Sequence, residues 1–201
     1  MSFSEIETVS KRASKAIGYS WGISEEIGKS IRILEMFKLP GISTLNQYFK
    51  KIKNNHPKKL KNILKINKSD DELCPIYTGV RILDNCNQLE DLNVIKFFNI
   101  NYPLLIIPFL SRSSDIINKP IHVILDQGKY ILNCNKTILT NIEKSNNCKI
   151  SKELTIQFEE NKNLFTDKEW KELYKLSEDT FVPETDSLKS SAAGAGLTDN
   201  D

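Results

Sequence analysis

The spacing of apolar residues changes near Cys74 in this 201-residue chain, and that change limits the folds open to it. Before this point apolar residues return every three or four positions, as on one side of an α-helix. After it they mostly alternate with polar residues, as in a strand with one buried face. We therefore predict an α+β fold: an N-terminal helical layer packed on a mixed, largely antiparallel sheet, with a C-terminal helix and an extended tail.

Three helices are expected within the first 55 residues. Ser2 or Ser4 is placed to cap the first, and Gly18 to end it in the left-handed conformation. Ser24 is expected to cap the second helix, and Ser43 to open the third. A further short helix is possible between residues 60 and 66.

Alternating and continuous apolar runs predict the strands of the sheet. They are expected at residues 76–82, 94–98, 104–107, 121–126, 129–134 and 154–158. The run at 104–107 is apolar throughout, as in a strand buried on both faces. Asp126-Gln127-Gly128 is a hairpin signal between two of the strands.

Two further helices are expected in the second half of the chain. Pro108 suits the first position of a helix that reaches about Asn118. Thr166 to Glu169 forms a capping box that opens a helix ending near Ser177.

The composition is that of one globular domain, with 39% hydrophobic and 27% charged residues. We place this domain at residues 1–182, with a helical part at 1–68, a sheet part at 69–160 and a helix at 163–180. The tail at 183–201 is rich in Gly, Ala, Ser and acidic residues, as disordered termini are. No signal-peptide core and no bilayer-length apolar run occurs, so a cytoplasmic protein with no membrane partner is expected.

The reactive side chains give no catalytic or metal signature. The four cysteines stand far apart and are expected in the core, at positions 74, 86, 134 and 148. Neither histidine, His56 or His122, lies beside a cysteine, so we expect no metal and no cofactor. No phosphate loop, dinucleotide fingerprint, serine elbow or zinc-protease motif is present. Whether the chain is an enzyme therefore stays open.

One block of sequence gathers several functional groups around a helix start. Ser20 supplies a hydroxyl, Trp21 an indole, and Glu25 and Glu26 two carboxylates, at a helix N-terminus whose backbone N–H groups favour anions. The alternative is structural: the polar residues cap the helix and Trp21 fills the core.

Arginine is rare, because lysine supplies 24 of the 28 basic residues. An arginine in such a chain can mark a place that needs a planar, forked donor. If Arg81 and Arg112 converge on one concave surface, they can bind a carboxylate or phosphate bidentately. Structural ion pairs with Asp84 or Asp115 are the alternative.

Residues 38–68 contain nine lysines and no acidic residue. The region Lys50–Lys68 is a possible footprint for nucleic acid. It lacks arginine, however, and the whole chain carries a net charge of only +2. A solvated face is preferred, and a nucleic-acid partner is not expected.

Several segments of the chain resemble a bacterial family catalogued only as domain of unknown function 3726. These segments are residues 3–13, 18–22, 25–26, 39–41, 108–112 and 194–201. The resemblance extends over nearly the whole chain and implies one cohesive unit. It brings no activity and no site residues.

Three functions stay open from the sequence. The first is a non-catalytic binding or accessory protein that acts through a protein partner or a second copy. Its docking residues would lie in the acidic tail, which complements the lysine-rich helices, at Leu197, Thr198, Asp199 and Asp201. The second is an enzyme or sensor for an anionic metabolite, using Arg81, Arg112 and the Trp21–Glu26 block. The third is a nucleic-acid-binding module.

Overall fold

The chain folds into two units, which are described separately. The structure, a computed structural model, describes residues 1–53, 66–67, 71–143, 149–159 and 164–180. The first unit is Met1–Glu160 and the second is Asn161–Asp201. The predicted α+β class is confirmed, since the first unit combines helices with a six-stranded sheet.

Three helices form the N-terminal layer: α1 (Phe3–Ile17), α2 (Trp21–Met36) and α3 (Gly41–Ile52). The predictions for α1 are confirmed, because Ser2 caps it and Gly18 ends it with a φ of 112°. The predicted cap of α2 is wrong: Ser20 accepts the hydrogen bond from the backbone, and Ser24 is buried within the helix. The third helix begins at Gly41, two residues before the predicted Ser43.

Small residues let α1 and α2 approach closely. A Cβ added at Gly28 would lie 2.7 Å from the backbone oxygen of Glu7 on α1. Ser10 and Ser14 of α1 are buried, as is Ser24 of α2. Side chains of this size permit a helix contact that larger apolar residues would push apart.

The strand predicted at 76–82 is wrong, because this segment is helix α4 (Pro75–Asp84). Pro75 occupies the first turn, and the Cys74 sulfur accepts a hydrogen bond from the backbone N–H of Tyr77, 3.5 Å away. Ile76, Gly79 and Ile82 are buried at helical spacing. The same sequence also alternates apolar and polar residues, so the two periods overlap and the helix start signal at Cys74-Pro75 decides between them.

The buried strand predicted at 104–107 is also wrong. The segment is a 3₁₀ turn, η2 (Pro103–Ile106), followed by α6 (Ile107–Ile117). All residues from 103 to 111 are buried, and a helix buried on every side has no apolar period to reveal it. The helix expected from Pro108 to Asn118 is confirmed, and Asn118 ends it in the left-handed conformation.

The sheet has the strand order β1-β2-β6-β3-β4-β5. Its strands are β1 (Ile66–Asn67), β2 (Val94–Asn101), β3 (Ile121–Leu125), β4 (Gly128–Asn133), β5 (Thr137–Thr140) and β6 (Ile150–Phe158). All neighbours pair antiparallel except β1, which is parallel to β2. The predicted hairpin is confirmed, since Leu125 pairs with Gly128 across a two-residue turn.

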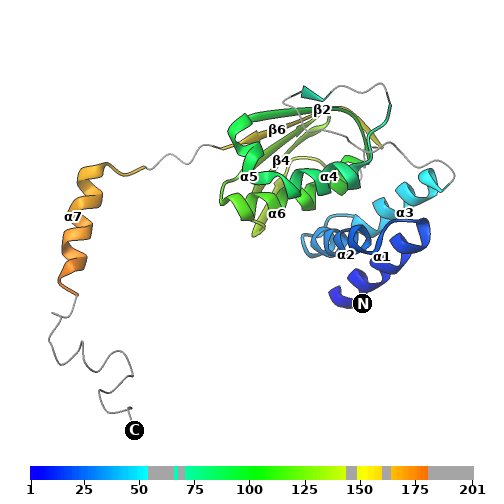
Figure 1. Cartoon of the computed structure of the whole chain (residues 1–201), viewed down its shortest axis with the longest axis horizontal. Coiled ribbons are helices and arrows are strands. Elements are labelled where there is room, and N and C mark those ends of the chain that lie inside the picture. The colour runs from blue at the N-terminus through cyan, green and yellow to red at the C-terminus, as the bar shows by residue number, and fades with distance from the viewer. Residues whose placement is uncertain (54–65, 68–70, 144–148, 160–163, 181–201) are drawn as a thin grey trace, which may run out of the picture. The chain divides into compact units, whose positions relative to one another are not determined.

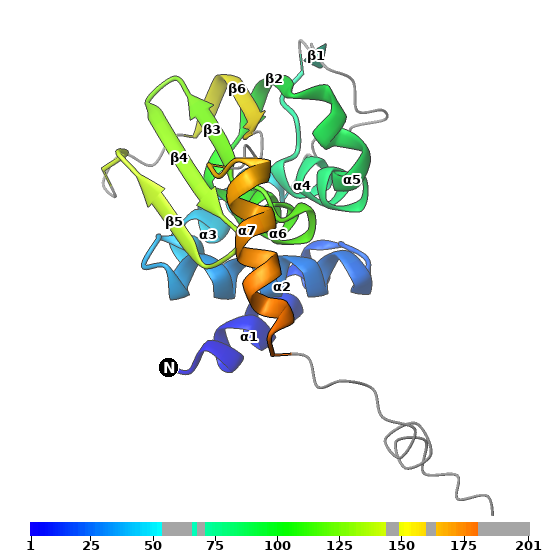
Figure 2. The same ribbon diagram turned by 90° about the vertical axis from the view of Figure 1, so that its left-hand side faces the viewer.

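The first unit is built in three layers (Figure 1). Helices α4 and α6 lie over one face of the sheet, as the two views in Figures 1 and 2 show. The short α5 (Cys86–Leu89) contacts both of them and is followed by the 3₁₀ turn η1 (Glu90–Leu92). The N-terminal helices form the third layer, in which α2 contacts both α4 and α6. The inward faces of the strands and both helical layers share one apolar core.

The second unit contains one described helix, α7 (Asp167–Glu178), whose predicted capping box is confirmed. No residue of α7 is buried. The predicted tail at 183–201 lies outside the described residues. The possible helix at 60–66 also lies outside them, except for Ile66, which belongs to β1. None of the described helices is long and apolar enough to cross a membrane.

Gly79→Ala tests the contact between α4 and α6. A Cβ at this position would lie 2.3 Å from Cδ2 of the buried Phe109 ring, so the ring or the helix must move. We expect the substitution to lower the free energy of unfolding by about 1–3 kcal/mol, measured by urea denaturation.

Gly22→Ala is the matched control. It also lies in a helix, but a Cβ there meets no atom within 4 Å, so helix propensity alone should act and stability should hold or rise by up to ~1 kcal/mol. Equal effects of the two substitutions would contradict the close packing of Gly79 on Phe109.

Candidate functional site

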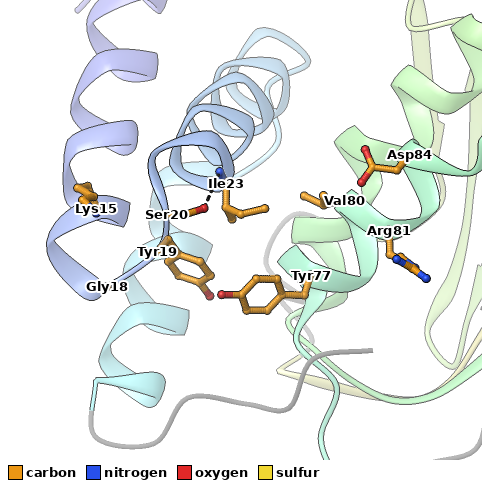
Figure 3. A pocket seen from close by; sticks show the side chains of 9 residues that line it. All are labelled: Lys15, Gly18, Tyr19, Ser20, Ile23, Tyr77, Val80, Arg81 and Asp84. Atoms are coloured by element: carbon orange, nitrogen blue, oxygen red, sulfur yellow. Dashed lines mark hydrogen bonds between the residues drawn. The ribbon is translucent and has the colours of Figure 1, made fainter. Parts of the chain in front are cut away.

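A groove of about 560 Å³ lies where the corner between α1 and α2 faces α4 (Figure 3). We call it the corner groove, and its lining residues are Lys15, Gly18, Tyr19, Ser20, Ile23, Tyr77, Val80, Arg81 and Asp84. They come from two parts of the chain that are more than 50 residues apart in the sequence.

Local chain geometry places both walls of the corner groove. On one side Gly18 ends α1 and the side chain of Ser20 caps α2, so that Lys15 and Ile23 flank a tight corner. On the other side Tyr77, Val80/Arg81 and Asp84 recur at three- and four-residue steps along α4. This spacing puts them on one side of the helix. Figure 3 shows Tyr77 and Val80 turned toward the corner, while the Arg81 guanidinium extends away from it in this view.

Tyrosine side chains form the floor of the corner groove. Tyr19 is only 2% exposed, and its ring centroid lies 5.6 Å from that of Tyr77. Beneath them, the Tyr48 hydroxyl donates a hydrogen bond to the Cys74 sulfur at 2.9 Å, and the Tyr19 hydroxyl donates to Tyr48 at 3.4 Å. This buried cluster joins the α1–α2 corner, α3 and the start of α4.

The Cys74 thiol is part of this framework and is not placed as a nucleophile. Its side chain is fully buried. Burial raises the pKa of the thiol, and it outweighs the hydrogen bonds from Tyr48 and the Tyr77 backbone, which lower it. Burial raises the pKa of Tyr19 and of Tyr48 as well. All three groups therefore stay protonated near neutral pH, and the thiolate that nucleophilic chemistry needs does not form.

Two cations on the walls of the corner groove have no carboxylate partner among the described residues. Lys15 and Arg81 are both exposed, and no ion pair joins either of them to any residue that the structure describes. The ammonium of Lys15 lies 5.4 Å from the Trp21 ring centroid. Asp84, one turn beyond Arg81, lines the same groove without pairing with it. The groove therefore carries one cation on each side of a partly apolar floor, and its α4 side carries the Asp84 carboxylate as well.

The structure distributes the predicted block of residues 20–26 over several environments. Ser20 lines the corner groove. Trp21 does not fill the core: it is 56% exposed and is flanked by Lys15 and Lys11, whose ammonium groups face its ring. Glu25 accepts a hydrogen bond from Lys11 at 2.5 Å, which lowers the pKa of its carboxyl.

Glu26 and Arg112 form a bridge between helices away from the corner groove. Glu26 on α2 pairs with Arg112 on α6 and, through its other oxygen, with Lys29 at 2.8 Å. Burial raises the pKa of Glu26, but the hydrogen bonds from Lys29 and Arg112 outweigh it and hold the pKa below its usual range. Arg112 lines a second pocket, of about 320 Å³, so the structure does not bring Arg81 and Arg112 to one pocket.

Sequence reasoning missed most of the corner groove. Tyr77 was assigned to a strand, so its place opposite Tyr19 had no signal. Lys15 lies three residues before Gly18, which the sequence identifies as the end of a helix. This spacing is the one sequence signal that places Lys15 at the corner. Among the described residues no group of His, Cys, Asp and Glu could hold a metal ion. The predicted docking residues of the tail, from Leu197 to Asp201, lie outside the described residues.

Comparison with known families covers the N-terminal part of the chain. Residues 1–74 match the model of a family described as Protein of unknown function (DUF3726), which confirms the predicted resemblance there. The match spans α1 to α3 and ends at Cys74, so segments 108–112 and 194–201 lie beyond it. No curated protein and no solved structure matches the chain.

The raised pKa of Cys74 predicts a loss of stability at alkaline pH. The unfolded chain releases the thiol proton near its ordinary pKa of about 8.5, whereas the folded protein retains it. The contribution of the protonated Cys74 thiol to the free energy of unfolding is therefore complete below that pH. It declines as the pH rises, by up to ~1.4 kcal/mol per pH unit. Cys74→Ser keeps an acceptor for Tyr48 and does not titrate.

Urea denaturation of both proteins between pH 7 and pH ~10 measures the difference. We expect the stability of Cys74→Ser to fall less steeply above about pH 8.5 than that of the unsubstituted protein. If the free energy of unfolding falls equally with pH in both proteins, the Cys74 thiol has the same pKa in the folded and unfolded states, which would contradict the prediction.

Proposed function

We propose that this protein is a non-catalytic binding protein that holds an acidic and partly apolar segment of a protein partner in the corner groove. The observation that supports this most directly is the pair Lys15 and Arg81. Both line one groove, both are exposed, and neither is paired with a described carboxylate. Cations in such a position attract and orient an anionic partner.

The openness of the corner groove favours a chain segment over a small metabolite. Small-molecule sites enclose most of the surface of their ligand. Here Lys15, Ser20, Arg81 and Asp84 are all exposed, and among the lining side chains only Tyr19 is buried. A segment of a partner protein can lie along such a groove with its ends in solvent.

The floor and the walls define what this segment should carry. Ile23, Tyr77 and Val80 are half-buried and offer apolar surface for one or two anchoring side chains. Carboxylates on either side of these anchors would meet Lys15 and Arg81. A nucleic-acid backbone is less well served, because it is held by neutralising many phosphates and only two cations line this groove among the described residues.

Arg81→Glu tests the proposal in the full-length chain. The partner is first isolated on the tagged protein from its own cells, identified and purified, and its dissociation constant is then measured by isothermal titration calorimetry. Because the substitution puts a carboxylate opposite an acidic segment, we expect binding to weaken about tenfold or more. Higher salt should weaken the wild-type complex as well.

Lys50→Glu is the matched control, since Lys50 is also an exposed cation in the last turn of a helix and does not line the corner groove. It makes the same kind of charge reversal and should leave the dissociation constant within about twofold of wild type. Equal weakening by both substitutions would show a general charge effect and would refute the groove as the binding site.

A further inference from the structure

The apolar side of α7 is exposed in the second unit. We define its apolar stripe as Trp170, Leu173 and Tyr174, which recur at the three- and four-residue spacing of one helix face. These side chains are 52%, 62% and 52% exposed. Single exposed apolar residues are ordinary on protein surfaces, but a contiguous stripe with two aromatic rings is typical of a binding surface.

The start of α7 is stabilised by its own residues. The Thr166 hydroxyl accepts a hydrogen bond from the backbone N–H of Glu169, and the Glu169 carboxylate accepts one from the backbone N–H of Thr166 at 2.7 Å. Phe165, just before the cap, packs on Trp170 with ring centroids 5.6 Å apart. A capping box and a hydrophobic staple together fix the helix start, so the stripe is presented in helical form before it meets a partner.

Carboxylates border the apolar stripe of α7. With about 100° of rotation per residue, Asp167 and Glu178 follow the stripe on one side, with Lys171 just beyond them, and Glu169 lies on the other side. Lys168, Glu172 and Lys175 fall on the opposite face. An apolar stripe bordered by carboxylates suits an apolar groove with basic rims, which is the helix-in-groove mode of recognition. It does not suit an anionic lipid surface, for which amphipathic helices carry lysine and arginine.

The corner groove has the chemistry that this helix requires. Its floor is partly apolar and its walls carry Lys15 and Arg81. We infer that α7 of one molecule docks into the corner groove of a second copy of the chain. This inference rests on the proposed function of the groove and names a partner for it.

A two-fold dimer would satisfy both surfaces at once, because each copy supplies one helix and one groove. Trp170 and Tyr174 are each 52% exposed, so two copies together could newly bury roughly 300–500 Å² of these side chains. With a similar area on the grooves, the total is roughly 600–1,000 Å², which is the size of a weak, transient interface. The carboxylates beside each stripe would then lie near cations that have no described partner.

Sedimentation velocity on the full-length chain from about 1 to about 200 μM tests the inference. We expect a monomer at the low end and a dimer at the high end. Trp170→Ala with Leu173→Ala should remove the dimer by shortening the stripe, and Arg81→Glu should remove it by reversing the charge of the groove. Lys175→Ala, on the opposite face of α7, is the matched control and should dimerise as wild type does.

Two results would overturn the inference: a wild-type monomer at every concentration, or a dimer that persists in the α7 and Arg81 variants. Its failure can be told apart from a failure of the groove itself by titrating a fluorescent peptide of residues 164–180 into the Trp170→Ala/Leu173→Ala protein. Peptide binding that Arg81→Glu abolishes would keep the proposed function even if the wild-type chain proves monomeric. No binding of this peptide, together with a wild-type monomer, would remove the second copy as partner.

Discussion

The hydrogen-bonded cluster of Tyr19, Tyr48 and Cys74 is the contact on which the rest of the first unit depends. Each residue comes from a different element: the α1–α2 corner, α3 and the residue that caps α4. Because all three are buried, their polar atoms must be paired within the protein, and they find their partners in one another. The cluster therefore fixes how the N-terminal helices sit on α4, and by doing so it sets the two walls of the corner groove at their separation.

The corner groove follows from this arrangement. The α1–α2 corner supplies Lys15 and Ser20, α4 supplies Tyr77 and Arg81, and the cluster links these two walls. The family match ends at Cys74, the residue at which the cluster reaches α4. The matched segment therefore contains one wall of the groove and the anchor of the other.

Sequence patterns predicted the helices and strands well where a local signal marked an end. Ser2, Gly18, the Asp126-Gln127-Gly128 turn and the Thr166 capping box all behave as expected. Prediction failed where tertiary burial replaced an amphipathic period. The segment at 104–107 is buried on all sides, and in α4 the β-branched residues alternate while also meeting the helical spacing. The error at α4 also hid the groove, because a strand at 76–82 could not have placed Tyr77 and Arg81 on one side. Arg112 shows the converse. The rarity of arginine in this chain suggested an anion-binding role for Arg112, but the structure pairs it with Glu26 in an ion pair between helices.

The central claim is that the corner groove is a binding surface for an acidic, apolar segment. A two-dimensional ¹H–¹⁵N NMR titration tests it most directly, with the isotope-labelled full-length Trp170→Ala/Leu173→Ala protein and an unlabelled peptide of residues 164–180. The account predicts that amide shifts change at residues 15–23 and 77–84 and return to their free positions when salt is raised. Shift changes confined to other parts of the chain would contradict it.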